Sequence, residues 1–347
     1  MIFIFRIMRF NKVLAWIVHV FAVIDPELQC AAVDLGVEEE EVGLIDVLVN
    51  NGNYEGRKLV TDVRVPGRIG NPKFFPFWRD ELKASPFILS TISEGYKLPF
   101  ESIPPPGIYQ NNKSMLRESD FAFTELLRLE QLGCISRVES APYLCLPLSV
   151  VFSKKLRLVV DASRHLNPYL EDRKVKLEDL SLREKILQQN DFQTKLDLDS
   201  GYWHVPLFPG HKKYVGCHFK NKDGSTLYWT WNVLFLGIKD AVYIFTKLLV
   251  PHKTYLRSMG IRNTIFIDDQ SVLAQSFDLC LAHTQITLNI LAKAGWVVNV
   301  KKSCDPPVQN MEFLGLMNNS IDMKYYVPEA KKQNICECKE NSFKSFS

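Results

Sequence analysis

Three aspartates in two separate apolar segments have the residue type and spacing to do chemistry together. Asp268 and Asp269 adjoin each other within the apolar stretch 261–273, and Asp197 lies on the polar side of the apolar segment 194–199. Adjacent acids at a hairpin tip are usually plain turn residues, so this pair alone indicates little. If the two segments are neighbouring strands, however, three carboxylates converge. Such a cluster repels itself unless a cation is bound.

The chemistry that such a cluster favours is nucleotidyl transfer. Carboxylate oxygens are the hard ligands that Mg²⁺ prefers, and Mg²⁺ keeps positions open for water and phosphate oxygens. Two such ions, about 4 Å apart, can activate an attacking hydroxyl and neutralise a leaving pyrophosphate. The chain contains no glycine-rich phosphate loop, which argues against a P-loop or Rossmann enzyme.

Short strands and three helices are expected to position these residues. The alternation of elements lacks the rhythm of a βαβ repeat, which predicts an α+β domain with a largely antiparallel sheet. The expected strands are 156–161, 194–199, 227–233, two within 261–273, 296–300, 313–316 and 324–327. The first expected helix runs from Ser119 to a C-terminal cap at Gly133. The second runs from Asp240 to Met259 and is kinked at Pro251. The third ends at Gly295 and buries Leu281, Leu288, Leu291 and Ala292.

Composition sets outer limits on the function. The chain has 347 residues, of which 46% are hydrophobic, and 42 Lys and Arg against 39 Asp and Glu give a net charge of +3. These ordinary globular values exclude a collagen-like, coiled-coil or wholly disordered chain. The small positive charge permits nucleic acid as a partner without demanding it. The eight cysteines are scattered without a C-x-x-C pair, which favours reduced thiols in an intracellular protein of the cytoplasm or nucleus.

The N-terminal region carries an apolar run at 13–24 behind three basic residues, which fits the apolar part of a signal peptide better than a membrane span. Twelve apolar residues are fewer than the roughly 20 that a membrane-spanning helix needs. No small-residue cleavage site follows the run, so we expect neither a secretory signal nor a membrane association. The weakly patterned stretch 25–75 gives no fold for the N-terminal segment.

Six motifs in a fixed order resemble the reverse transcriptases of eukaryotic retroelements, most closely those of DIRS-type retrotransposons. They are LRLVVDASRHLN at 156–167, KLDLDSGYWHVPL at 195–207, LGIKDAVYIFTK at 236–247, FIDD at 266–269, GWVVNVKKS at 295–303 and EFLGL at 312–316. The resemblance covers residues 77–328 and implies an RNA-directed DNA polymerase that adds deoxynucleotides to a primer 3′-hydroxyl. It further implies two Mg²⁺ ions, replaceable by Mn²⁺, and an RNA or DNA template with primer and deoxynucleoside triphosphates as partners.

The resemblance also implies a right-hand polymerase fold of the α+β class. Its expected parts are an N-terminal segment of unknown fold at 1–75, a fingers-like region at 76–190, a palm-like catalytic region at 191–328 and a tail at 329–347. The short tail leads us to expect a truncated or absent thumb.

Roles follow at the positions that match the motifs. The residues that would catalyse the reaction and bind the metal ions are Asp197, Asp268 and Asp269. Those that would bind the nucleotide are Arg157, Lys155, Tyr202, Gly237 and Lys302. Those that would bind the primer are Phe313, Leu314 and Gly315. Tyr202 would exclude a ribonucleotide's 2′-hydroxyl, and Arg157 would hold the triphosphate, for which a planar guanidinium is well suited.

Departures from the family pattern keep two alternatives open. Leu236, Lys239 and Asp240 stand where other residue types are usual, and a negative Asp240 beside a nucleotide is unfavourable unless it caps the following helix. The chain could therefore be a degenerate, inactive retroelement fragment, or a non-catalytic nucleic-acid-binding protein on the same fold. Its oligomeric state does not follow from the sequence.

Overall fold

The computed structural model describes residues 64–299, 301–329 and 331–332. The chain divides into the units Met1–Val63 and Arg64–Ser347, and every described residue belongs to the second. The apolar run at 13–24 lies outside the described residues. Residues 64–75, which we grouped with the N-terminal segment, form the short 3₁₀ helices η2 (Arg68–Gly70) and η3 (Pro72–Phe74). They belong to the second unit because Ile69 and Phe74 are part of its hydrophobic core.

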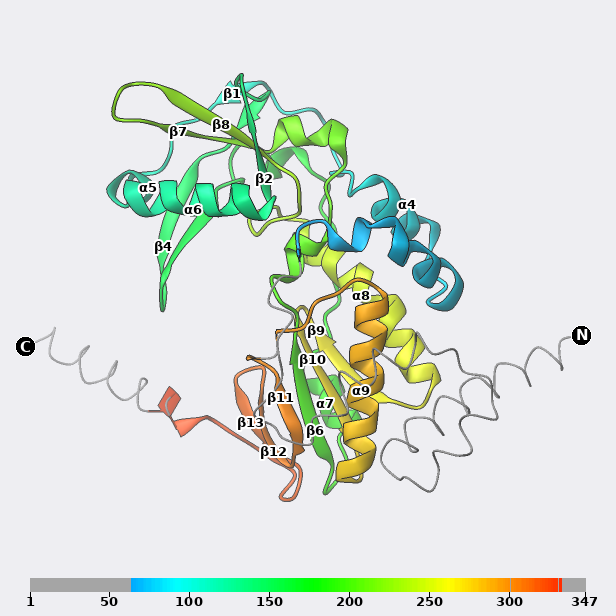
Figure 1. Cartoon of the computed structure of the whole chain (residues 1–347). Coiled ribbons are helices and arrows are strands. Elements are labelled where there is room, and N and C mark those ends of the chain that lie inside the picture. The colour runs from blue at the N-terminus through cyan, green and yellow to red at the C-terminus, as the bar shows by residue number, and fades with distance from the viewer. Residues whose placement is uncertain (1–63, 300, 330, 333–347) are drawn as a thin grey trace, which may run out of the picture. The chain divides into compact units, whose positions relative to one another are not determined.

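A five-stranded sheet occupies one part of this unit (Figure 1). Its strand order is β1-β3-β7-β8-β2, with parallel pairing at β1–β3–β7 and antiparallel pairing at β7–β8–β2. The strands are β1 (Gly107–Ile108), β2 (Ile135–Val138), β3 (Leu144–Cys145), β7 (Gly216–Lys220) and β8 (Thr226–Trp231). β7 and β8 lie within the range 191–328, which we predicted to be palm-like. They nevertheless pair with β2 and β3, which lie within the range 76–190 that we predicted to be fingers-like. Pairing between distant segments is a tertiary feature that local patterns do not specify.

The same part of the chain, from Phe77 to Val160, also forms helices and a separate hairpin. They are η4 (Phe77–Glu81), α4 (Pro86–Glu94), α5 (Lys113–Arg117), α6 (Ser119–Leu132), and the hairpin of β4 (Leu148–Phe152) with β5 (Leu156–Val160). The helix predicted to begin at Ser119 is confirmed. It ends at Gly133, whose left-handed backbone directs its N–H to the carbonyl of Glu130.

A four-stranded antiparallel sheet with the order β11-β6-β10-β9 contains the two segments with the aspartates. Its strands are β6 (Phe192–Asp197), β9 (Arg262–Phe266), β10 (Asp269–Ala274) and β11 (Cys304–Val308). Figure 1 shows α8 (Ala241–Ser258) and α9 (Phe277–Lys293) beside these strands. The Thr194 hydroxyl contacts that of Thr284 on α9 at 2.6 Å, so α9 covers the face to which Thr194 points. The α+β class and the largely antiparallel sheets are confirmed.

The C-terminal described residues form a three-stranded antiparallel sheet of β12 (Asn310–Phe313), β13 (Leu316–Asn319) and β14 (Lys324–Tyr326). The single strand predicted at 313–316 is wrong, because Phe313 ends β12, Leu316 begins β13, and the two residues between them are a turn. The strand at 296–300 is also wrong over its described residues, where only Val298 makes an isolated bridge, to Leu198. In α9, Leu291 is buried as predicted, whereas Ala292 is exposed.

Asp240 does not cap α8 through its side chain, contrary to our expectation. Its backbone is already helical, whereas a capping residue usually has an extended backbone that directs its oxygen to the first free N–H groups. The Asp240 carboxylate instead accepts a hydrogen bond from the Tyr96 hydroxyl, and Arg173 lies 3.8 Å away. Burial raises the pKa of this carboxyl to about 7. α8 continues as one helix through Pro251.

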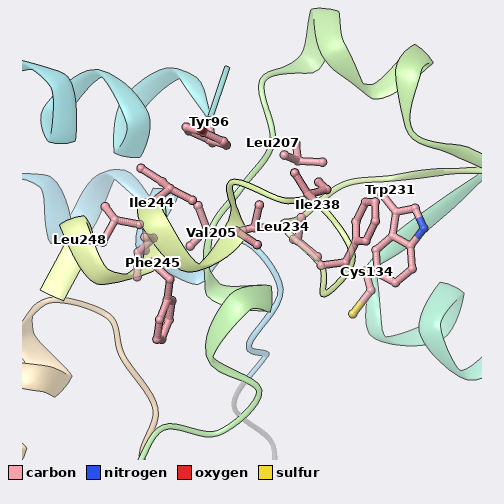
Figure 2. Close-up of a cluster of buried hydrophobic side chains, with 14 of the residues drawn as sticks. Tyr96, Cys134, Val205, Leu207, Trp231, Leu234, Ile238, Ile244, Phe245 and Leu248 are labelled. Atoms are coloured by element: carbon pink, nitrogen blue, oxygen red, sulfur yellow. The ribbon is translucent and has the colours of Figure 1, made fainter. Parts of the chain in front are cut away.

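One hydrophobic cluster connects α8 with the five-stranded sheet. Figure 2 shows Ile244, Phe245 and Leu248 of α8 on one side, and Trp231 of β8 on the other. Val205, Leu234 and further apolar residues lie between them. Because burying each large apolar side chain stabilises a fold by about 1.5–3 kcal/mol, this cluster fixes the loops that lead into α8. Among the described helices, none is long and apolar enough to cross a lipid bilayer.

Candidate active site

Asp197 and Asp269 are direct register partners in the β6–β10 ladder. Directly opposite residues of an antiparallel pair share a face, with their Cβ atoms about 4.5–5.5 Å apart. The Leu198 amide donates a hydrogen bond of 3.1 Å to the carbonyl of Asp268, which extends the pairing into the turn before β10. The expectation that the two aspartate-bearing segments are neighbouring strands is confirmed.

The turn before β10 is strained and partly buried. Ile267 has a φ of 55°, a left-handed conformation that is rare for a β-branched residue. Such strain is often found at functional sites. Burial above all raises the pKa of Asp197 and of Asp268, and repulsion from the neighbouring carboxylates adds to it. The charge of Lys302 opposes the shift at both carboxyls.

Two lysines pair with two of these three aspartates. Lys195 Nζ lies 2.8 Å from Asp269 Oδ1, and Lys302 Nζ lies 3.4 Å from Asp197 Oδ1. Within the described residues, no three side chains of His, Cys, Asp or Glu are grouped closely enough to hold a metal ion. The oxygen chemistry of Asp197 and Asp269, on facing strand positions, nevertheless fits a hard divalent cation. The role of the aspartates as metal ligands stays a prediction.

Tyr202 lies in η6 (Gly201–His204), close to the aspartates. Its half-buried ring packs against Phe245 of α8, with ring centroids 5.0 Å apart. Burial raises the pKa of the Tyr202 hydroxyl, and the negative charge of Asp268 raises it further. Tyr202 therefore lies close enough to Asp268 to feel its charge. The predicted contact of Tyr202 with a sugar stays a prediction.

Gly237 approaches another backbone where no side chain would fit. Its φ is 127°, and a Cβ atom at this position would lie 2.5 Å from the carbonyl oxygen of Val160 at the end of β5. Its own carbonyl accepts a hydrogen bond of 2.9 Å from Asn167 Nδ2. Glycine is thus required here for its backbone freedom and its missing side chain. The predicted contact of Gly237 with a nucleotide stays a prediction.

Arg157 and Lys155 lie on the β4–β5 hairpin, which is a two-stranded sheet of its own. Both side chains are exposed, and Ser153 N donates to the Lys155 carbonyl across the hairpin turn. The structure does not place these two residues in the sheet with the aspartates. Their predicted contact with a triphosphate is not tested by their position.

Phe313 ends β12, and Leu314 and Gly315 form the turn between β12 and β13. Phe313 is fully buried, whereas Leu314 and Gly315 both have positive φ angles, of 50° and 80°. Lys331 closes the turn by donating hydrogen bonds to the Gly315 carbonyl at 2.9 Å and to Glu312 at 3.0 Å. The motif thus contains a tight turn, and its contact with a primer stays a prediction.

Residues 148–317 match the family model described as "Reverse transcriptase (RNA-dependent DNA polymerase)". By this match, residues 148–317 correspond to a reverse transcriptase domain. The curated relatives of the chain include the genome polyproteins of the Shepherd and Hohn isolates of Petunia vein clearing virus. Each is 23% identical over 163 residues, which are 47% of this chain and 7% of the polyprotein. The chain therefore spans only a small part of these relatives, and they do not test the DIRS-type assignment.

Solved structures of a foamy viral protease–reverse transcriptase share the fold of the domain. The complex with double-stranded DNA has a TM-score of 0.56 and 19% identity, over 68% of this chain and 39% of that chain. The complex with an RNA/DNA hybrid has a TM-score of 0.54 and 18% identity, over 68% of this chain and 30% of that chain. The predicted polymerase fold of the α+β class is thus confirmed.

Sequence reasoning missed two cations of the reverse transcriptase domain, Lys195 and Arg183. Arg183, on α7 (Leu180–Ile186), is fully buried and donates hydrogen bonds to Gln193, to Ser271 and to Asn318. Burial lowers its pKa to about 10, so it remains charged at neutral pH. The alternation of polar residues along 193–197 was a signal for Lys195, whereas no local pattern marked Arg183. This alternation indicates a strand face that is polar over its whole length.

Proposed function

We propose that this chain acts as an RNA-directed DNA polymerase, which transfers a deoxynucleotide to the 3′-hydroxyl of a primer. The observation that carries the proposal is the register pair of Asp197 and Asp269, with Asp268 in the adjoining turn, inside a reverse transcriptase domain. Reverse transcriptases depend in general on divalent metal ions. For this chain we propose two Mg²⁺ ions, which Mn²⁺ can replace.

The three aspartates would hold these ions, because their carboxylates are the hard ligands that the four-stranded sheet presents together. When bound, the ions would activate the primer hydroxyl and neutralise the negative charge of the leaving pyrophosphate. Asp197 and Asp269 would contribute from facing strands and Asp268 from the turn. This arrangement explains why acids with raised pKa values accumulate at one end of the β6–β10 ladder.

The other predicted residues would bind and orient the nucleotide. Tyr202, held against Phe245, would lie beneath the sugar and exclude a 2′-hydroxyl. Lys302 would face the pyrophosphate from its place beside Asp197, which it already contacts. Gly237 would let the backbone approach the template–nucleotide pair. Arg157 and Lys155 would hold the triphosphate from the β4–β5 hairpin.

A primer paired with an RNA or DNA template is the proposed macromolecular partner. The foamy viral protein, whose fold resembles this domain, forms complexes with double-stranded DNA and with an RNA/DNA hybrid. Both are duplexes of the kind that a template and its primer form. Phe313, Leu314 and Gly315 would contact the primer strand, and exposed lysines would contact phosphates without reading the sequence.

Primer extension on a poly-rA template with an oligo-dT primer tests the proposal. The purified chain and its Asp268→Asn variant are compared in Mg²⁺ and in Mn²⁺, after thermal melting has shown that both are folded. We expect extension by the wild type and a loss of at least about 100-fold in the variant, as when an electrostatic contact to a transition state is removed. Equal extension by both would refute the site assignment. No extension by either folded protein would favour the degenerate fragment.

A further inference from the structure

One face of the four-stranded sheet is polar along strand β6. Because side chains alternate along a strand, Gln193, Lys195 and Asp197 of β6 point to the same side. On β10, Ser271 lies opposite Lys195 and Asp269 lies opposite Asp197. Lys195 is therefore the diagonal neighbour of Asp269, at a spacing that a long side chain can bridge.

The ion pair between Lys195 and Asp269 is short and largely shielded from water. Lys195 Nζ lies 2.8 Å from Asp269 Oδ1, and the two side chains are only 22% and 23% exposed. Exposed ion pairs contribute little because water and salt screen them, but this screening weakens as a pair becomes buried. A charge-assisted hydrogen bond of this length holds the carboxylate oxygen that a cation would need.

Lys195 is also held in place by its backbone. It pairs with Ser271 of β10 on one side and with Cys304 of β11 on the other, so it lies in the interior of the sheet. Lys302 lies in a turn and not in a strand, its side chain is 65% exposed, and its distance to Asp197 is longer, at 3.4 Å. Of these two lysines, Lys195 is therefore the fixed one.

We propose that Lys195 is the built-in counter-ion of Asp269: it holds this carboxylate while no cation is bound, and it sets the affinity of the site for a divalent cation. The proposal rests on the function proposed above, since it concerns the same cation site. A cation and the Lys195 ammonium compete for the carboxylate of Asp269. Anything that stabilises the pair therefore weakens cation binding, and removal of the ammonium strengthens it.

Lys195 is a positioning residue in this account, because it acts through Asp269 and not on the substrate. We expect two effects when the Lys195 ammonium is removed, and the loss of a purely structural residue would not produce both. The protein without cation loses thermal stability, because the carboxylates are left to repel one another. The same protein gains more stability than the wild type when the cation is added.

Binding of Mn²⁺ to the purified chain, without nucleotide or nucleic acid, tests the proposal. Free Mn²⁺ is followed by electron paramagnetic resonance, and melting temperatures are measured in EDTA and in Mn²⁺. We expect Lys195→Met to bind Mn²⁺ about 5-fold or more tightly than the wild type, a typical coupling between two linked sites. We also expect this variant to melt at a lower temperature in EDTA. Lys195→Arg, which keeps the charge, should remain close to the wild type.

The matched control is Lys302→Met, which removes the same charge from the exposed partner of Asp197. We expect less than about a 2-fold change, because exposed pairs are weak. An equal gain in both methionine variants would overturn the proposal, since net charge alone would then explain it. Unchanged or weaker binding in Lys195→Met, or in Lys195→Gln should the methionine variant not fold, would also overturn it. Absence of Mn²⁺ binding by the folded wild type would instead refute the cation site itself, and the proposal with it.

Discussion

The guanidinium of Arg183 lies over the ring of Phe313, 4.5 Å from its centroid, although the two residues are far apart in the sequence. Phe313 directly precedes the turn that we propose contacts the primer, and Arg183 also donates a hydrogen bond of 2.9 Å to Asn318 on β13. Through further hydrogen bonds to Gln193 and Ser271, the same side chain is fixed to the polar face of the four-stranded sheet. Arg183 thus ties the β12–β13 turn to the sheet that carries the aspartates.

Replacing Arg183 is expected to destabilise the protein strongly. In Arg183→Met the hydrogen-bond acceptors on Gln193, Ser271 and Asn318 lose their donor, and each buried unsatisfied group costs about 1–3 kcal/mol. We expect the free energy of unfolding in urea to fall by about 3 kcal/mol or more. Arg128→Met, which breaks a partly exposed pair with Glu125, is the control and should cost about 1 kcal/mol or less. A similar loss in both variants would contradict the bridging role of Arg183.

Gly237→Ala is expected to disturb the loop before α8 through a collision and not through its backbone angle alone. The new Cβ would lie 2.5 Å from the Val160 carbonyl, which is backbone and cannot turn aside. Gly224→Ala is the matched control, because Gly224 also has a positive φ, of 90°, but has open space around it. We expect the control to lose about 1 kcal/mol and Gly237→Ala to lose clearly more, as measured by urea unfolding. Equal losses would show that the close approach to Val160 is unimportant.

His252 should make the fold sensitive to acid. The ring is fully buried: its Nδ1 lies 3.2 Å from the Leu248 carbonyl, and its Nε2 accepts a hydrogen bond of 3.2 Å from the Trp296 indole. These partners fit only the neutral imidazole with its proton on Nδ1. Burial lowers the pKa of His252 to about 3, well below the value of about 6.5 in an unfolded chain. The unfolded state therefore binds more protons between these values, and stability is lost as the pH falls below about 6.5.

His252→Asn should reduce this acid sensitivity. One proton difference corresponds to about 1.4 kcal/mol per pH unit, so the loss of unfolding free energy between pH 7 and pH 5 should shrink by about 2 kcal/mol. Urea unfolding at both pH values measures the effect. His165→Asn, at a half-buried ring stacked on Tyr109, is the control and should change the loss less. A variant with the wild-type dependence on pH would contradict the assignment of His252 as a buried neutral base.

Tyr202 is expected to select the sugar of the incoming nucleotide. Tyr202→Ala removes the ring that packs against Phe245 and opens space beneath the proposed sugar position. We expect the preference for deoxynucleotides over ribonucleotides, measured as a ratio of kcat/KM values, to fall by about 10-fold or more. Tyr202→Phe removes only the hydroxyl and should keep the preference. An unchanged ratio in the alanine variant would mean that Tyr202 is only a core residue.

The sequence predicted those features that depend on local patterns. The helix from Ser119 to Gly133 and the strands that carry Asp197 and Asp269 were predictable because periodicity and cap residues are local. The order of the motifs then indicated the fold. The turn at Leu314 and Gly315 was predicted as part of a strand because the segment 313–316 is rich in apolar residues. The positive φ angles of the two turn residues leave no trace in such a pattern.

The features that were missed depend on tertiary contacts. Asp240 has the residue type of a helix cap, but the buried hydroxyl of Tyr96 binds its carboxylate, from a segment about 140 residues away. The ion pair of Lys195 with Asp269 depends on strand register, which the sequence does not specify. The burial of Arg183 requires acceptors from three other segments, so no local pattern could have revealed it.

Primer extension by Asp197→Asn beside Asp199→Asn tests the central claim most directly. Both variants remove one negative charge from the same stretch of chain, but only Asp197 is paired with Asp269; the register ends there, and Asp199 lies beyond it. With an RNA template and Mg²⁺, we predict that Asp197→Asn loses at least about 100-fold in rate, whereas Asp199→Asn stays within a few-fold of the wild type. Equal extension by the two variants would contradict the claim that the facing pair of Asp197 and Asp269 is the catalytic centre.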